Sequence, residues 1–275
     1  MLNDSAWTSI RPQTGWRVVD LREVWAYREL LLTLTLKDIR VRYKQTVIGA
    51  AWAVFQPLLT MIIFTIIFGR LAKIPSGEYP YPIFVFAALL PWMFFANAIT
   101  SSANSLVISS QLVNKIYFPR IIIPMSSIGV SFVDFMFSTA VLLVLMVIFD
   151  VSWTFQLLMM PLVMFGVILC ALGVGTLLSA LTVSYRDLRF VIPFAVQIWM
   201  FLSPVVYGTS FIPEDYRWII LINPMTGYIE GFRSAILGGA IDWFALGVSF
   251  SISVALLMAG SMYFRSVERK FADVI

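Results

Sequence analysis

Long apolar stretches separated by short polar segments dominate this chain. A helix that spans a bilayer needs about 20 mostly apolar residues, and six stretches are long enough. We predict spanning helices at 49–68, 82–107, 121–149, 155–183, 190–207 and 243–264. The third stretch contains one ionisable residue, Asp134, and the other five contain none. The predicted fold is an all-α membrane protein with a polar arm (1–48), a membrane domain (49–264) and a short tail (265–275).

The N-terminal arm has the pattern of an amphipathic helix. Its apolar positions recur at helical spacing, at Trp25, Leu32, Leu36, Ile39 and Tyr43. Beside them runs a basic stripe of Lys37, Arg40 and Lys44. Such a helix lies in the inner membrane interface with its cations toward anionic headgroups. It serves either as an anchor alone or also as a surface on which a cytoplasmic partner rests.

The basic residues set the expected orientation. If the N-terminus is cytoplasmic, 15 of the 19 Lys and Arg residues fall on the cytoplasmic side, in the arm, the inner loops and the tail. Cytoplasmic loops carry an excess of Lys and Arg, so we expect both termini in the cytoplasm. Residues 1–22 lack an apolar run, so we expect no cleavable signal peptide.

Composition excludes several classes of protein. Hydrophobic residues make up 60% of the chain and charged residues 12%, where a soluble domain has about 25% charged residues. A typical soluble enzyme, a nucleic-acid-binding domain and a disordered chain are therefore excluded. There is no histidine, the single cysteine is Cys170, and the P-loop pattern G-x-x-x-x-G-K-[ST] is absent. We therefore expect no metal site, no nucleotide site and no catalytic residues in this chain.

Three polar segments are candidates for contacts outside the membrane. The inner loops 109–120 (SSQLVNKIYFPR) and 184–189 (SYRDLR) mix charge with aromatic residues. This suits a short helix pressed into a groove of a partner, or a solvated turn that only enforces topology. The outer segment 208–241 is too long for a turn, and its apolar run 218–222 is too short to span. We expect re-entrant or interfacial helices there, as an outer gate or as a lid over a packing gap.

Within the membrane, Asp134 and the aromatic residues are the notable features. Ion-coupled transport normally needs several ionisable residues in the membrane, and this chain has a single carboxylate there. We therefore expect Asp134 to pair with a nearby Ser, Thr or Asn. The chain has 23 Phe, 10 Tyr and 9 Trp. Trp52, Phe55 and Trp199 lie where interfacial belt residues would not. Flat aromatic faces suit sugar rings, although packing is the alternative role.

Five motifs in order carry a family resemblance. They are LTLKDIRVRYKQTVIGAAWAVFQPLL (34–59), NKIYFPRIIIP (114–124), SYRDLRFVIPF (184–194), SPVVY (203–207) and NPMTGYIEGFR (223–233). Together they resemble the permease subunits of ABC-2 type polysaccharide exporters, which export lipid-linked O-antigen, teichoic acid and related glycans. The capsule-type branch is expected to differ in the first span, so O-antigen-like cargo is favoured.

The resemblance implies an inner-membrane homodimer that joins two copies of a separate ATPase, where ATP and Mg bind. The implied cargo is a glycan on a polyprenyl-diphosphate lipid, handled among membrane lipids without any nucleic acid. The residues implied in coupling to the ATPase are Lys115, Tyr117, Tyr185, Arg186, Asp187 and Arg189. Those implied in meeting the lipid diphosphate or the interface are Lys37, Arg40, Arg42 and Lys44. The implied channel lining is Trp52, Phe55, Trp92, Trp199 and Tyr207, and the implied outer gate is Trp218, Asn223, Tyr228, Glu230 and Arg233.

Two other functions stay open from the sequence. An ABC-2 permease for a smaller lipid or drug would have a narrow seam instead of a continuous aromatic channel. A polytopic glycosyl- or acyltransferase would need acid–base or nucleophilic residues near the interface. The absence of histidine and of carboxylate clusters, apart from Glu214 and Asp215, argues against such an enzyme.

Overall fold

The structure is a computed structural model that describes residues 21–44, 51–268 and 271. All regular elements in these residues are helices, arranged as a bundle with α4 (Tyr81–Ile108) in its middle. Five helical segments are long and apolar enough to cross a membrane. They are α3 with η1 (Ala51–Phe64, Thr65–Leu71), α4, α6 (Ile122–Ile148), η2 with α7 (Phe155–Met159, Met160–Ser184) and α11 (Trp243–Val267). Each end lies within three residues of its predicted position.

Helix α4 forms the core of the bundle. It is buried along most of its length and packs against α3, α6, α7 and α10. A second close contact joins α7 and α11, where a Cβ atom added to Gly260 would lie 2.4 Å from the Gly173 carbonyl oxygen. Only glycine at position 260 allows the two backbones to approach this closely, and small residues at such crossings are typical of helix packing in membranes.

The fifth predicted span is shorter than expected. Helix α8 (Leu188–Phe201) has 14 residues, so it rises about 21 Å, whereas the hydrocarbon core is about 30 Å thick. The prediction of a helix to residue 207 was wrong at this end. Pro204 has no N–H to continue the ladder, and the Ser203 hydroxyl donates to the Trp199 carbonyl at 2.9 Å. Non-helical residues then reach the outer end of α4, where the Tyr81 hydroxyl donates to the Val206 carbonyl at 2.7 Å.

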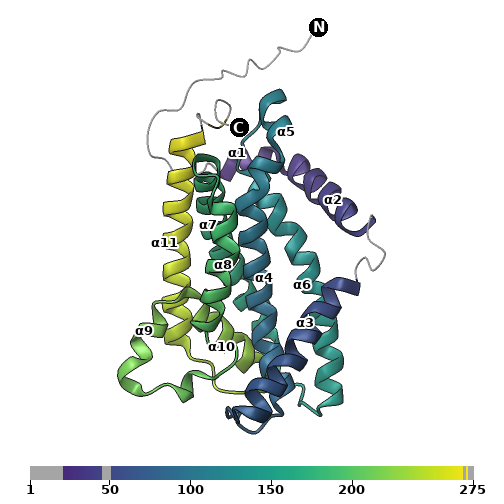
Figure 1. Ribbon diagram of the computed structural model, residues 1–275, viewed down its shortest axis with the longest axis vertical. Helices are drawn as coiled ribbons and strands as arrows, with labels where there is room; N and C mark the ends of the chain where they lie inside the picture. The colour runs from purple at the N-terminus through teal and green to yellow at the C-terminus, as the bar shows by residue number, and fades with distance from the viewer. Residues whose placement is uncertain (1–20, 45–50, 269–270, 272–275) are drawn as a thin grey trace.

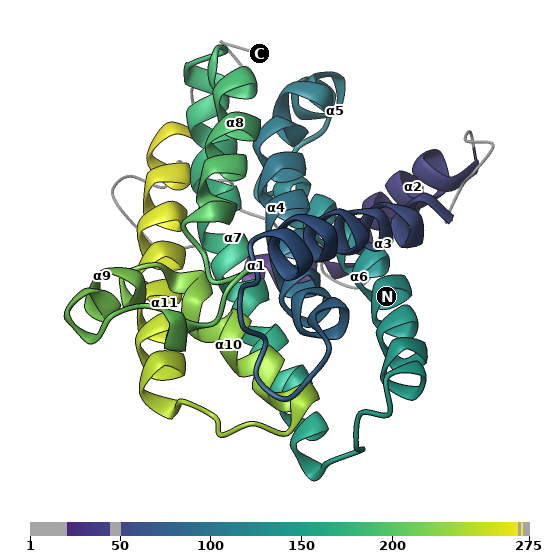
Figure 2. The same cartoon turned by 60° about the horizontal axis from the view of Figure 1, so that its bottom comes forward.

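The predicted outer helices are present between α8 and α11. Two short 3-10 turns, η3 (Thr209–Phe211) and η4 (Glu214–Tyr216), precede α9 (Arg217–Leu221) and α10 (Pro224–Leu237). Helix α9 lies at the periphery of the bundle and α10 lies inside it (Figure 2). Nearly all of α10 is buried, against α4, α7 and α11. Within the segment where re-entrant or interfacial helices were expected, α10 is therefore a helix packed inside the domain.

The arm and the inner loops gather at the opposite end of the bundle. Helices α1 (Leu21–Ala26) and α5 (Ser110–Lys115) lie at the same end of the bundle as the C-terminal end of α11 (Figure 1). An ion pair of 2.7 Å between Glu23 and Arg265 ties α1 to α11. Helix α2 (Arg28–Lys44) packs on α6 and buries Leu34, while Leu32 and Leu36 on the predicted apolar face are exposed. Leu32 and Leu36 are therefore free to meet lipid or another chain.

Candidate functional site

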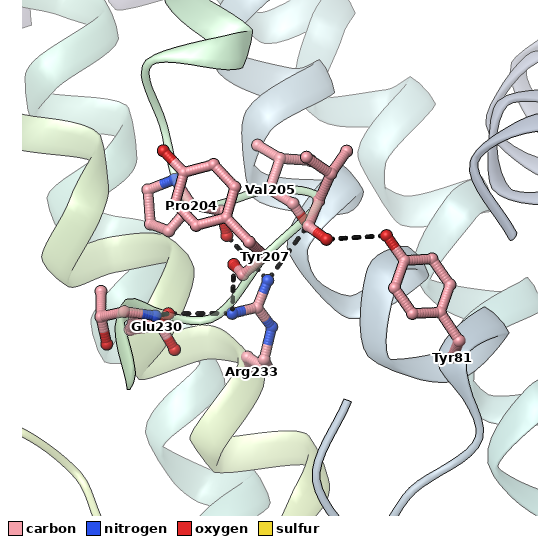
Figure 3. A network of polar contacts seen from close by, with 8 residues as sticks. Tyr81, Pro204, Val205, Tyr207, Glu230 and Arg233 are labelled. Carbon is pink, nitrogen blue, oxygen red and sulfur yellow. Dashed lines mark hydrogen bonds and ion pairs between the residues drawn. The ribbon is translucent and has the colours of Figure 1, made fainter. Parts of the chain in front are cut away.

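The junction between α8 and α10 is the most extensive polar network that the described residues show. Its centre is Arg233 on α10, which is 4% exposed. One guanidinium nitrogen donates to the Pro204 and Val205 carbonyls at 2.7 and 3.1 Å, and the other pairs with Glu230 at 2.9 Å (Figure 3). These carbonyls belong to the non-helical chain that follows α8. Arg233 thus satisfies backbone groups that the short helix leaves without helical partners.

Electrostatics hold this arginine in place. Burial lowers the pKa of Arg233, and the neighbouring Glu230 carboxylate opposes that shift. The guanidinium carbon lies 3.9 Å from the centroid of the Phe84 ring on α4, so a cation–π contact adds to the ion pair. Glu230 also accepts a hydrogen bond of 2.8 Å from the Thr209 backbone N–H. We call Arg233, Glu230 and the carbonyls of residues 204–205 the Arg233 clamp.

Asn223 makes a second link between the same elements. Its side-chain oxygen caps α10 by accepting from the Met225 N–H at 3.0 Å, and it also accepts from the Trp199 indole N–H at 3.0 Å. Its amide nitrogen donates to the Ser203 hydroxyl at 2.8 Å. The SPVVY and NPMTGYIEGFR motifs, whose first residues are 20 positions apart, are therefore bonded into one unit.

The remaining predicted gate residues lie in different surroundings. Tyr228 is buried and its hydroxyl donates to Ser253 of α11 at 2.9 Å. Trp218 on α9 is 62% exposed. The structure thus brings Asn223, Glu230 and Arg233 together at the α8–α10 junction, places Tyr228 between α10 and α11, and leaves Trp218 on the surface. Their role as a gate stays a prediction.

The five predicted channel residues do not share one surface within the chain. Trp52 and Phe55 on α3 are about half exposed. Trp92 is 2% exposed and packs edge-on against Trp199, with 6.3 Å between ring centroids. Tyr207 is partly buried beside the Arg233 clamp, where burial raises the pKa of its hydroxyl. In this conformation only Trp52 and Phe55 present broad faces to the outside.

The predicted coupling residues gather at the end of the bundle that holds α1 and α5 (Figure 1). Tyr117 and Tyr185 are 70% and 63% exposed, on the two different inner loops. A hollow of about 260 Å³ joins these loops, with Ser110 from one side and Arg186 and Arg189 from the other on its walls. The remaining predicted coupling residues, Lys115 and Asp187, are exposed. The two loops therefore form one charged and aromatic surface.

Asp134 has a partner that the sequence did not indicate. The expectation of a nearby Ser, Thr or Asn was wrong, because the Asp134 carboxylate pairs with Arg42 of α2 at 2.8 Å and accepts a hydrogen bond from the Tyr43 hydroxyl. Burial and this hydrogen bond raise the pKa of Tyr43, so its hydroxyl remains a donor. The sequence feature that could have indicated this ion pair is the opposite charge of Arg42 on the arm and Asp134 in the third span. The other arm cations differ: Lys37 pairs with Asp38 at 3.2 Å, and Arg40 and Lys44 are exposed.

These features define a multi-pass, all-α membrane protein with one charged and aromatic surface at one end and the bonded α8–α10 junction at the other (Figure 1). The chain matches the ABC-2 type transporter family over residues 29–237 and belongs to that family. It is 28% identical to an O-antigen export system permease protein RfbA of Klebsiella pneumoniae, over 90% of this chain and 95% of the relative. The corresponding protein of Myxococcus xanthus is also 28% identical, over 93% of this chain and 98% of the relative. The polysialic acid transport protein KpsM of Escherichia coli is 23% identical, over 86% and 92%.

Proposed function

We propose that this chain is the permease subunit of an ATP-driven exporter that moves a lipid-linked polysaccharide across the inner membrane. The observation that carries the proposal is the near full-length match to relatives named for the export of O-antigen or the transport of polysialic acid. Cargo of the O-antigen type is favoured because the RfbA proteins share 26–28% identity with this chain and the KpsM proteins share 23%.

The energy would come from a separate ATPase that carries ATP and Mg, since this chain has no P-loop pattern. The surface formed by the two inner loops supports this part of the proposal. It combines exposed Tyr117 and Tyr185 with the exposed charges of Arg186 and Asp187, which is the chemistry of a docking surface for a protein partner. Two ATPase copies would bind two copies of this surface. Both termini would then lie in the cytoplasm, as the distribution of Lys and Arg indicates.

The transport path would lie between two copies of the chain. Helices α3 and α8 both pack on buried α4 and expose large apolar side chains, among them Trp52, Phe55, Phe190 and Phe194. Helix α8 is also too short to present a full apolar span to lipid. A second copy would cover these faces and enclose the exposed aromatic rings, against which sugar rings could slide.

The lipid diphosphate would approach from the inner leaflet beside α2. Arg40 and Lys44 are exposed there, and cations at this interface attract anionic headgroups as well as a diphosphate. Arg42 has a different role in this proposal, because its guanidinium is held by Asp134. Arg40 and Lys44 are therefore the stronger candidates for first contact with the cargo.

Co-isolation with the ATPase tests the proposal. The purified chain should co-purify with a P-loop ATPase whose activity rises when lipid-linked glycan is added. Replacing both Arg186 and Asp187 with Ala should reduce that stimulation about tenfold or more, because truncating buried charged contacts at an interface costs about 2–5 kcal/mol. The matched control is Arg217→Ala on α9 at the opposite end of the bundle. Unchanged stimulation in the double variant, or glycan transport without any ATPase, would overturn the proposal.

A further inference from the structure

A cavity of about 490 Å³ with mostly apolar walls lies among α2, α3, α4 and α6. Each of the four helices contributes a polar side chain to these walls: Arg42 from α2, Gln56 from α3, Asn97 from α4 and Asp134 from α6. Ser131 and Ser138 add two hydroxyl groups. The volume falls in the range of about 300–1,000 Å³ that is typical of small-molecule sites. Asp134 is an ionisable residue within a span, and such residues commonly mark a functional site.

The charge of the cavity decides which ligand fits. Arg42 and Asp134 neutralise each other at 2.8 Å, and they are the only ionisable Lys, Arg, Asp or Glu residues among the described lining residues. A diphosphate would meet the Asp134 carboxylate, and a cation would meet Arg42. The walls therefore favour a neutral ligand that both donates and accepts hydrogen bonds.

The two amides supply that capacity. Across residues 21–44 and 51–268, no hydrogen bond from a protein group reaches the Gln56 or Asn97 side chains. Each amide offers two N–H donors and one carbonyl acceptor, which is the set that neighbouring hydroxyl groups of a sugar can satisfy. Trp52, half exposed at the cavity wall, adds a flat indole face that suits the apolar C–H face of a sugar ring.

We propose that this cavity binds a neutral pyranose unit of the glycan, as a site separate from the Arg40 and Lys44 surface on the arm. The inference rests on the proposed function, because it takes the cargo to be a glycan. The cavity is too small for a polymer and holds one or two sugar units. Its arrangement positions the glycan end near the first span, with hydrogen bonds from Gln56 and Asn97 and ring stacking on Trp52.

Thiol protection tests the proposal in the full-length protein. Cys170 is the only cysteine and is buried, so Cys170→Ala gives a background without thiols. Ala53→Cys then places one thiol on the cavity wall. The probe is a short neutral glycan released from the host's lipid-linked polysaccharide by mild acid. It should slow maleimide labelling at residue 53 in a concentration-dependent manner, whereas farnesyl diphosphate, which carries a lipid diphosphate without sugar, should not.

Variants of the two amide residues test whether Gln56 and Asn97 bind the glycan that protects the thiol. Gln56→Leu and Asn97→Leu should each raise the glycan concentration needed for half protection about fivefold to tenfold, as expected for the loss of hydrogen bonds. The control is Asn104→Leu, two turns further along α4 and outside the cavity, which should leave the protection unchanged. Gln56 is exposed on α3, so its variant remains informative if Asn97→Leu fails to fold.

Two results would overturn the inference. One is protection by farnesyl diphosphate and not by the glycan, which would show an anion site. The other is protection that survives both Gln56→Leu and Asn97→Leu. Glycan-stimulated ATPase activity is measured in parallel on the unmodified complex. If that stimulation is present and protection is absent, the cavity assignment fails and the proposed function stands, whereas loss of stimulation itself counts against the proposed function.

Discussion

Removing the charge of Arg233 should destabilise the outer half of the protein strongly. In Arg233→Met, Glu230 keeps its charge without its partner, and the Pro204 and Val205 carbonyls lose their donor. Breaking a buried ion pair costs about 3–5 kcal/mol. The cost of losing the two carbonyl hydrogen bonds is not added to this value, because contributions within one bonded network are not additive. We therefore expect a loss of about 3–5 kcal/mol.

A second Glu–Arg pair of the same spacing provides the control. Glu214 and Arg217 also lie three residues apart, at 3.5 Å, but their side chains are 86% and 46% exposed, against 19% and 5% for Glu230 and Arg233. Exposed pairs contribute about 0–1 kcal/mol. Arg217→Met should therefore leave the stability almost unchanged, although it removes the same charge from the same segment.

The assay is the temperature at which half of the detergent-solubilised protein remains monodisperse. Arg233→Met should lower it by on the order of 10 °C, and Arg217→Met by much less. Adding Glu230→Gln to Arg233→Met should recover part of the loss, because the glutamine removes the unpaired charge. Equal effects of the two arginine variants, or no recovery in the double variant, would refute the reasoning that burial makes this pair important.

Three further predictions concern the other contacts. Asn223→Ala should cost about 1–2 kcal/mol through loss of the α10 cap, and should change the tryptophan emission spectrum because the Trp199 indole loses its acceptor; an unchanged spectrum would contradict that contact. Asp134→Asn should release α2, seen as faster protease cleavage in the arm, and adding Arg42→Met should accelerate cleavage no further. Burial raises the pKa of Glu268, so the stability that its protonated form contributes is present at low pH and is lost as pH rises through the raised value. Glu268→Gln should therefore become more stable to heat than the native chain as pH rises from about 4.5. A stability difference between the two proteins that narrows as pH rises would count against this assignment.

The sequence predicted the long spans well and the broken one poorly. The ends of α4, α6 and α7 follow from apolar runs, free of charge apart from Asp134 in α6, with polar or charged segments at their borders, which is local information. The end of α8 depends on Pro204 and on partners in α10, more than 20 residues further along. Apolar residues continue to 207 in the sequence, so hydropathy alone could not place the end of this helix at Phe201.

For the candidate site as well, the sequence indicated the segments involved but not the contacts between distant residues. The family resemblance implied Asn223, Glu230 and Arg233 as members of one outer gate, and the structure shows that they bond to the chain after α8. The pairing of Asp134 with Arg42 joins residues 92 positions apart, and their opposite charges were visible in the sequence. The choice of that partner came from the packing of α2 on α6, which periodicity within the arm did not reveal.

Export by purified components tests the central claim most directly. This chain and its co-isolated ATPase are placed in vesicles with lipid-linked glycan in the leaflet that faces the ATPase, and the glycan that reaches the opposite leaflet is measured by its access to a membrane-impermeant glycosidase. The account predicts that glycan becomes accessible with ATP and Mg, and that a non-hydrolysable ATP analogue does not support continued transport. Glycan that crosses at the same rate without the ATPase or without ATP would contradict it.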